Sequence, residues 1–135
     1  MKVTDIKAYT VDSSPADCVR FAIEGMRIKF DFVISGINRG LNLGIDVLYS
    51  GTLGAVFEAA TFGIPAIALS AKTGGFDEAM ETLEEIKEFF VRNNLMKKNS
   101  VYNINIPFSI ASIILFIVST VSIGYLPIAV SPLIA

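Results

Sequence analysis

The sequence predicts an α/β protein with a parallel sheet, and two observations lead to this prediction. Short apolar runs with β-branched residues recur at Phe32–Ile37, Ala66–Ser70 and Val101–Ile106. Uninterrupted runs of this kind are typical of parallel strands that are covered on both faces. Helical patterns alternate with the runs, and a β-α-β-α order favours one parallel sheet with helices packed on its faces.

The N-terminal part of the chain is expected to form a strand and then a capped helix. Lys7–Val11 has the pattern of a short strand. Ser14 is a suitable N-cap, Pro15 fits the first helical position, and Asp17 stands where a capping box needs an acceptor. We expect this helix to run to about residue 26, with three residues on its inner face: Cys18, Ala22 and Met26.

Two further helices are predicted between the later strands. Gly51–Phe62 is rich in small apolar residues, which suits close packing against a sheet. Phe76–Asn93 is amphipathic, with acidic residues in its first half, where the helix dipole favours negative charge. Its inward-facing side chains should be Ile86, Phe89 and Phe90. Pro107 ends the strand that follows.

Composition narrows the classes of function. The chain has 135 residues, one domain by length, and its net charge of −2 gives no reason to expect nucleic-acid binding. It contains no histidine, which excludes histidine-based triads and histidine metal ligands. Cys18 is the single cysteine, so no internal disulfide can form. The polar N-terminus does not have the pattern of a secretory signal, and we expect a cytoplasmic protein.

The glycine-rich segment from Asn38 to Thr52 is the candidate ligand site. It follows a predicted strand, and ligands bind beyond the carboxyl ends of strands in such sheets. Asn38 offers a carbonyl oxygen to a hard divalent cation. Ser50, Gly51 and Thr52 offer hydroxyl and N–H groups at a helix start, which suits a phosphate. The alternative is that these residues only form turns; the density of polar and glycine residues favours a ligand site.

Five segments together resemble the SurE (survival protein E) family. They are Ser-Ser-Pro-Ala-Asp-Cys-Val at 13–19, Ser-Gly-Ile-Asn-Arg-Gly at 35–40 with Asn42 and Gly44, Val-Leu-Tyr-Ser-Gly-Thr at 47–52, Gly-Ile-Pro-Ala-Ile-Ala at 63–68, and Asn-Ile-Asn-Ile-Pro at 103–107. Their order and spacing are similar to those of the family from Val3 to Pro107.

The resemblance implies a Rossmann-like core and a metal-dependent 5′- and 3′-nucleotidase, an acid phosphatase that hydrolyses nucleoside monophosphates. It also implies a homo-oligomer and a magnesium or manganese ion. Asn38 matches the metal-binding asparagine of the family. Ser50, Gly51 and Thr52 match its phosphate-contacting turn, with Asn42 nearby. No catalytic residue can be named from the resemblance.

One departure concerns the metal. The family begins with an inner strand that ends in an Asp-Asp pair of metal ligands, and this sequence contains no such pair. We therefore expect an incomplete sheet with exposed apolar edges, weak metal binding by Asn38 alone, and little activity of the isolated chain. An alternative is a non-catalytic module that binds a phosphate or a nucleotide.

The other departure is the tail. We divide the chain into a partial SurE-like domain, 1–107, and an apolar segment, 108–135. No charged residue follows Lys98, and the mean hydropathy of the whole chain is +0.60. Phe108–Leu126 is long enough to span a bilayer, which would make this a membrane-anchored fragment. The competing interpretation is a frameshift product, and the two are compatible.

Overall fold

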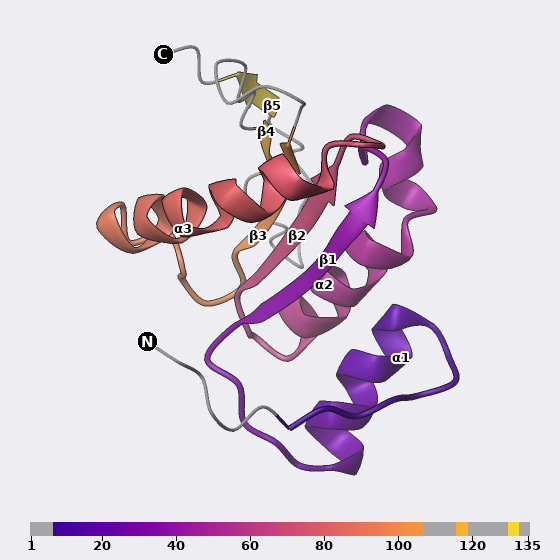
Figure 1. Cartoon of the computed structure of the whole chain (residues 1–135). Helices are drawn as coiled ribbons and strands as arrows, with labels where there is room; N and C mark the ends of the chain where they lie inside the picture. The colour runs from indigo at the N-terminus through magenta and orange to yellow at the C-terminus, as the bar shows by residue number, and fades with distance from the viewer. Residues whose placement is uncertain (1–6, 107–115, 119–129, 133–135) are drawn as a thin grey trace.

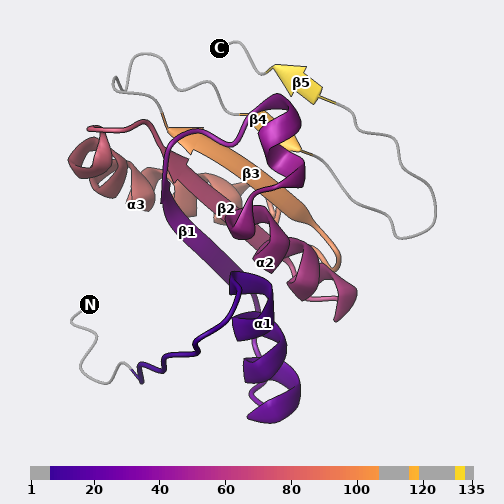
Figure 2. The same ribbon diagram turned by 90° about the vertical axis from the view of Figure 1, so that its right-hand side faces the viewer.

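The computed structural model describes residues 7–106, 116–118 and 130–132 of the chain (Figure 1). A three-stranded parallel sheet in the order β1-β2-β3 forms its centre. Figure 2 shows α2 (Gly51–Thr61) on one face of this sheet and α3 (Phe76–Arg92) on the other. The α/β fold class predicted from the sequence is confirmed. The strands are β1 (Val33–Arg39), β2 (Ala66–Ala71) and β3 (Val101–Ile106).

The strands β2 and β3 form the buried part of the sheet. All residues of both strands are buried, because α2 and α3 cover opposite faces of them. Their pairing is regular, from Ala66 opposite Val101 to Ala71 opposite Ile106. The predicted strand bounds therefore agree with the structure to within one residue.

Two apolar clusters lie on the two faces of the sheet. Under α3, Ile67, Leu69 and Ile104 pack with Phe90, and the Phe90 ring meets Tyr102 edge-to-face at 4.8 Å between centroids. The partly buried Ile86 and Phe89 pack against this cluster, as predicted. Under α2, small residues dominate the second cluster and allow close packing of the helix on the sheet. Its buried members are Leu53, Val56, Ala59, Ala60, Ala66, Ala68 and Val101.

The strand β1 corrects one expectation. We expected Phe32–Ile37 to be covered on both faces, but β1 lies at the edge of the sheet and its burial alternates along the strand. Val33 packs against the α2 cluster, whereas Ile34, on the other face, is 54% exposed. The cluster beneath α3 draws its buried strand residues from β2 and β3, so Ile34 has little cover. The expectation of an exposed apolar edge agrees with this arrangement.

The helix α1 (Pro15–Arg20) begins as predicted and continues as a π-helical turn, Phe21–Gly25. Ser14 and Asp17 form a complete capping box. The Ser13 hydroxyl, then the Ser14 hydroxyl and backbone N–H, donate hydrogen bonds to the Asp17 carboxylate and lower the pKa of that carboxyl. The carboxylate therefore caps the helix rather than serving the candidate site.

The prediction of a strand at Lys7–Val11 is wrong. Lys7 to Val11 have no strand pairing in the described part of the chain. A strand needs a partner to satisfy its backbone groups, and the run of residues that suggested a strand could not supply one by itself.

Most of the apolar tail lies outside the described residues. Two short strands are described within it, β4 (Phe116–Val118) and β5 (Val130–Pro132), which pair antiparallel. Phe116–Val118 falls inside the expected membrane helix and is a strand instead. Among the helices that the structure describes, none combines the length and apolarity needed to cross a bilayer. The division of the chain at Pro107 stays a prediction.

Two isoleucines on the α3 face of the sheet, Ile104 and Ile34, offer a matched test of this packing. Ile104→Ala should lower the free energy of unfolding by about 2–5 kcal/mol, because Ile104 is 1% exposed and its loss leaves a cavity. Ile34→Ala should cost about 1 kcal/mol or less, since that side chain is already half in solvent. Urea unfolding followed by circular dichroism measures both, and equal losses would show that Ile34 is covered in solution.

Candidate functional site

A cavity of about 360 Å³ opens beyond the carboxyl end of β1. Three consecutive pieces of chain line it: the end of β1, the loop that follows, and the start of α2. Four of the five residues assigned to the site from the sequence are among the lining residues. The full set is Asn38, Arg39, Gly40, Leu41, Asn42, Asp46, Tyr49, Ser50 and Gly51.

A bulge in β1 determines where Asn38 lies. Ser35 pairs with Ala68 and Asn38 pairs with Ser70, so three steps along β1 match two along β2. Because paired residues point to the same face, the bulge puts Asn38 on the face of Ser70. Gly36, inside the bulge, has φ +132°, and a Cβ there would lie 2.4 Å from the Leu69 carbonyl oxygen. Only glycine permits this approach of β1 to β2.

The side-chain amide of Asn38 is held by the loop. Its Nδ2 donates to the carbonyl oxygen of Gly40 at 2.8 Å, and the Gly40 N–H in turn donates to the Ala71 carbonyl oxygen at 2.8 Å. This orientation leaves Oδ1 as the acceptor atom of the side chain, and the binding of a cation by Asn38 stays a prediction.

The start of α2 supplies the predicted turn. Ser50 is the N-cap, and its Oγ accepts from the Leu53 N–H at 3.3 Å. The N–H groups of Gly51 and Thr52 belong to the first turn, whose donors have no acceptor within the helix. Ser50 and Gly51 line the cavity, whereas the half-buried Thr52 is not among the lining residues. The turn can therefore present backbone donors and partial positive charge to an anion.

A buried amide network anchors the loop to the sheet, and Asn42 is its centre. The Asn42 N–H donates to Asn105 Oδ1 at 2.8 Å, and its side-chain Nδ2 donates to Ser70 Oγ at 2.6 Å. The Asn42 carbonyl oxygen accepts from Asn103 Nδ2 at 2.9 Å and from Asn105 Nδ2 at 3.3 Å. Asn42 lines the cavity, and these four bonds use its backbone N–H, its backbone carbonyl and its side-chain Nδ2 to fix the loop.

Sequence reasoning assigned no role to three lining residues, Arg39, Asp46 and Tyr49. Arg39 and Asp46 are the two charged residues around the cavity, and Tyr49 is 84% exposed at its edge. The Arg39 guanidinium carbon lies 6.0 Å from the centroid of the Phe76 ring, at the start of α3. The opposite charges of Arg39 and Asp46, close to each other in a glycine-rich segment, were a sequence signal that could have identified these two residues. Nothing in the sequence links Arg39 to Phe76.

The described residues do not by themselves fit a divalent cation. Magnesium and manganese take several oxygen ligands, usually including carboxylates. Around the cavity the structure offers the Asn38 amide oxygen and one exposed carboxylate, Asp46. In the part of the chain that the structure describes, no group of three or more acidic, histidine or cysteine side chains is placed so that it could hold a metal ion. Further ligands would be required to hold the metal.

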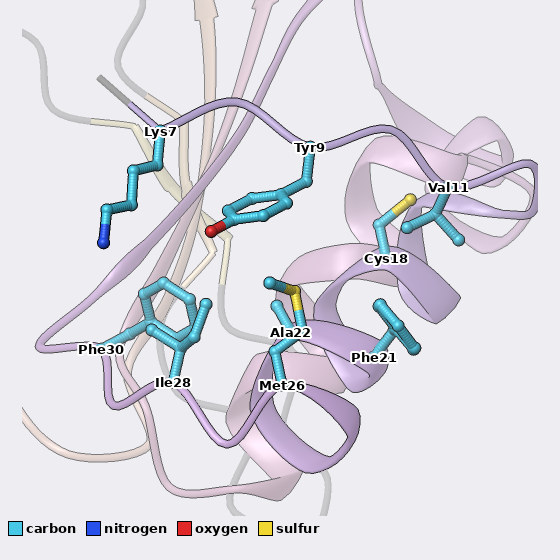
Figure 3. A pocket seen from close by; sticks show the side chains of 9 residues that line it. All are labelled: Lys7, Tyr9, Val11, Cys18, Phe21, Ala22, Met26, Ile28 and Phe30. Carbon is cyan, nitrogen blue, oxygen red and sulfur yellow. The ribbon is translucent and has the colours of Figure 1, made fainter. Parts of the chain in front are cut away.

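A second cavity, of about 580 Å³, lies beside α1 and is mostly apolar (Figure 3). Cys18, Ala22 and Met26, which we expected on the inner face of the first helix, line this open cavity. They do not belong to a closed core. Figure 3 shows Lys7 and Tyr9 on the side of the N-terminal segment, facing Ile28 and Phe30 across the opening. Its described lining residues include no asparagine, unlike those of the first cavity. The lining residues are Lys7, Tyr9, Val11, Cys18, Phe21, Ala22, Met26, Ile28 and Phe30.

Comparisons with known proteins relate the chain to one family. The family model described as "Survival protein SurE" matches residues 1–122, beyond the point at Pro107 where we expected the family pattern to end. The "5′-nucleotidase SurE" of Thermoanaerobacter sp. (strain X514) is 48% identical over 106 residues, which are 76% of this chain and 42% of the relative. That of Carboxydothermus hydrogenoformans is 42% identical over 113 residues, 78% of this chain and 42% of the relative.

A solved structure agrees with these sequence matches. The SurE protein of Aquifex aeolicus superposes with a TM-score of 0.63 at 36% sequence identity, covering 73% of this chain and 41% of that chain. The chain spans about two fifths of the length of the curated relatives it matches.

Gly36 in β1 and Gly40 just after it offer a test of the close approach of β1 to β2. Gly36→Ala should lower the free energy of unfolding by about 3 kcal/mol or more, because the new Cβ meets the Leu69 carbonyl at 2.4 Å. Gly40→Ala, also at positive φ but with open space around it, should lose only the backbone term of about 1–3 kcal/mol. Chemical denaturation compares the pair. If Gly36→Ala lowered the free energy of unfolding less than Gly40→Ala, the bulge geometry would be contradicted.

Proposed function

The chain belongs to the SurE family, and from this premise we propose that it binds nucleoside monophosphates through their phosphate group. In this proposal the chain supplies the phosphate-binding part of a metal-dependent 5′-nucleotidase. The supporting observation is that Asn38, Asn42, Ser50 and Gly51, from the end of β1, the loop after it and the start of α2, line one cavity. The relatives that match the chain are named 5′-nucleotidases.

The chemistry of the cavity suits a phosphate monoester. A phosphate dianion at the start of α2 would accept hydrogen bonds from the Gly51 and Thr52 N–H groups and interact favourably with the helix dipole. The Ser50 hydroxyl is already an acceptor for Leu53, so its remaining role is to donate its proton to a phosphate oxygen. The nucleoside would extend out of the cavity, past the exposed Tyr49 ring.

Hydrolysis needs more than this binding site. Phosphoryl transfer requires a cation to offset the developing charge and to orient the attacking water. Among the described residues, Asn38 is the one that matches a family metal ligand, and the sequence has neither histidine nor an Asp-Asp pair. When bound, magnesium or manganese would supply that charge and the activated water. We therefore propose low turnover by the chain alone.

The second candidate is a non-catalytic module that binds phosphate or a nucleotide. Among the described residues, no group of acidic, histidine or cysteine side chains is placed to hold a metal ion, and binding at a helix start does not require a metal; both points favour this candidate. Homo-oligomeric assembly and membrane association through the tail stay predictions from the family resemblance and from the apolar tail.

Backbone amide shifts would locate phosphate binding. Titration of the full chain with adenosine monophosphate, followed by two-dimensional NMR, should shift the amide signals of Gly51 and Thr52 most, because their N–H groups would donate to the phosphate. The amide of Gly63, just beyond the other end of α2, serves as the internal control. Larger shifts at Gly63 than at Gly51 would place binding elsewhere.

Phosphate release tests the proposed low turnover of the chain alone. With adenosine monophosphate and manganese, the chain should turn over at least about 100-fold more slowly than the Carboxydothermus hydrogenoformans relative assayed in parallel, because several kcal/mol of metal-derived stabilisation are missing. Comparable turnover that Asn38→Ala abolishes would instead show that the chain assembles a complete metal site.

A further inference from the structure

We propose that the cavity beside α1 binds a fatty acid of medium length, with its carboxylate at Lys7 and Tyr9 and its apolar chain along α1 (Figure 3). This inference goes beyond the proposed function and does not depend on it, because the two cavities share no lining residue. It assigns a ligand of stated chemistry to a cavity in which the phosphate-binding proposal has no part.

Three pieces of chain direct side chains into this cavity (Figure 3). The N-terminal segment contributes every second residue, Lys7, Tyr9 and Val11, which is the alternation expected of an extended segment. The segment after the π-helical turn contributes Ile28 and Phe30 in the same way. The enclosed volume of about 580 Å³ lies within the range of small-molecule sites. The third piece is α1 with its π-helical continuation and C-cap, which contributes Cys18, Phe21, Ala22 and Met26.

The helical wall of the cavity fits an elongated apolar chain. Cys18, Ala22 and Met26 are spaced four residues apart and so lie along one side of the helix, over roughly 10–12 Å of its length. Phe21 and Phe30 also line the cavity and are 51% and 38% exposed, so it contains apolar surface that the fold leaves uncovered. An apolar chain would bury that surface, whereas a compact polar ligand would not.

The polar groups of the lining lie at one end of the cavity. Figure 3 shows the Lys7 amine and the Tyr9 hydroxyl directed toward the end where Phe30 lies, away from Cys18. Of the nine described lining residues, Lys7 alone is charged. Lys7 forms no ion pair with another described residue. The cavity therefore presents one positive charge beside apolar surface, which is complementary to an amphipathic anion.

One ammonium group and one hydroxyl match a carboxylate. The ammonium offers a single charge, and together with the hydroxyl it can donate hydrogen bonds to both oxygens of a carboxylate. A phosphate monoester would bring a second negative charge, for which the described lining offers no second cation. An uncharged alcohol or lipid would leave the amine beside apolar surface without a counter-ion. A free fatty acid is thus the occupant that fits both ends of the cavity.

The first experiment compares decanoate with decan-1-ol by calorimetry on the full chain, at mildly alkaline pH and below the concentration at which decanoate forms micelles. Lys7→Gln should weaken decanoate binding about 3- to 10-fold and change decanol binding less than about 2-fold, because only the carboxylate meets the amine. Lys29→Gln is the matched control, since Lys29 lies between Ile28 and Phe30 in the sequence but does not line the cavity. It should change the dissociation constant of decanoate less than about 2-fold.

The single cysteine reports where the ligand lies. Saturating decanoate should slow the alkylation of Cys18 by iodoacetamide about 5-fold or more, because the bound chain would restrict access to the thiol. Hexanoate at the same concentration should protect Cys18 less, since each methylene that is lost lowers the affinity about 2- to 4-fold. Decanoate should also raise the thermal unfolding temperature of the parent chain, because a ligand of the native state stabilises it. A detergent effect would lower that temperature.

The inference is supported if Lys7→Gln weakens decanoate binding, Lys29→Gln does not, and decanoate protects Cys18. Decanoate binding that Lys7→Gln leaves unchanged overturns it. Decanoate binding that leaves Cys18 fully reactive places the ligand elsewhere and overturns it as well. A parent chain that binds no decanoate, and whose Cys18 becomes reactive only on dilution, would show that a second copy covers the cavity, which also contradicts the inference.

Discussion

The candidate site depends on one buried contact, the hydrogen bond from the Asn42 N–H to Asn105 Oδ1. It joins the loop after β1 to β3, the strand farthest from β1 in the sheet, and the Asn42 side chain adds a bond to Ser70 of β2. A buried amide without these partners would be costly, so the loop has one favourable position. That position brings the end of β1 and the start of α2 around one cavity. The anchoring of this loop is thus what turns two short motifs into a site.

A second contact places the start of α1 beside the start of α2. A Cβ on Gly51 would lie 3.2 Å from the Pro15 side chain, and Gly54 lies beside Ala16, so small residues let the two helices run close together. One turn farther along, Arg20 and Glu58 form an ion pair at 2.7 Å. The capping box that starts α1 and the turn that starts α2 are therefore neighbours. A glycine at the start of α2 serves packing as well as access for a ligand, and both requirements select the same residue.

The apolar surfaces of the molecule are unevenly covered. β2 and β3 are buried on both faces, whereas the exposed side chains of β1 include Ile34, and Phe30 and Phe32 just before it are also exposed. The predicted inner face of α1 lines an open cavity rather than a core. Exposed strand edges and apolar faces favour association with other polypeptide segments. The buried strands β2 and β3 thus form the well-packed part of the fold, and the less covered surfaces lie on β1 and beside α1.

The sequence by itself determined the buried strands, the two long helices, the capped start of α1 and four of the residues that line the site. Each of these follows from local pattern: uninterrupted apolar runs, helical periodicity, and capping or glycine-rich turns. The strand expected at Lys7–Val11 failed because a strand exists only with a partner, which no local pattern specifies. A glycine within a strand, Gly36, is the sequence feature that indicates the bulge before Asn38. The register shift itself depends on how closely β1 approaches Leu69 of β2. Only the tertiary structure could show that Asn42 is an anchor and that Arg39 rests on Phe76. Those contacts join residues tens of positions apart, and the geometry of such pairs arises from the packing of whole elements.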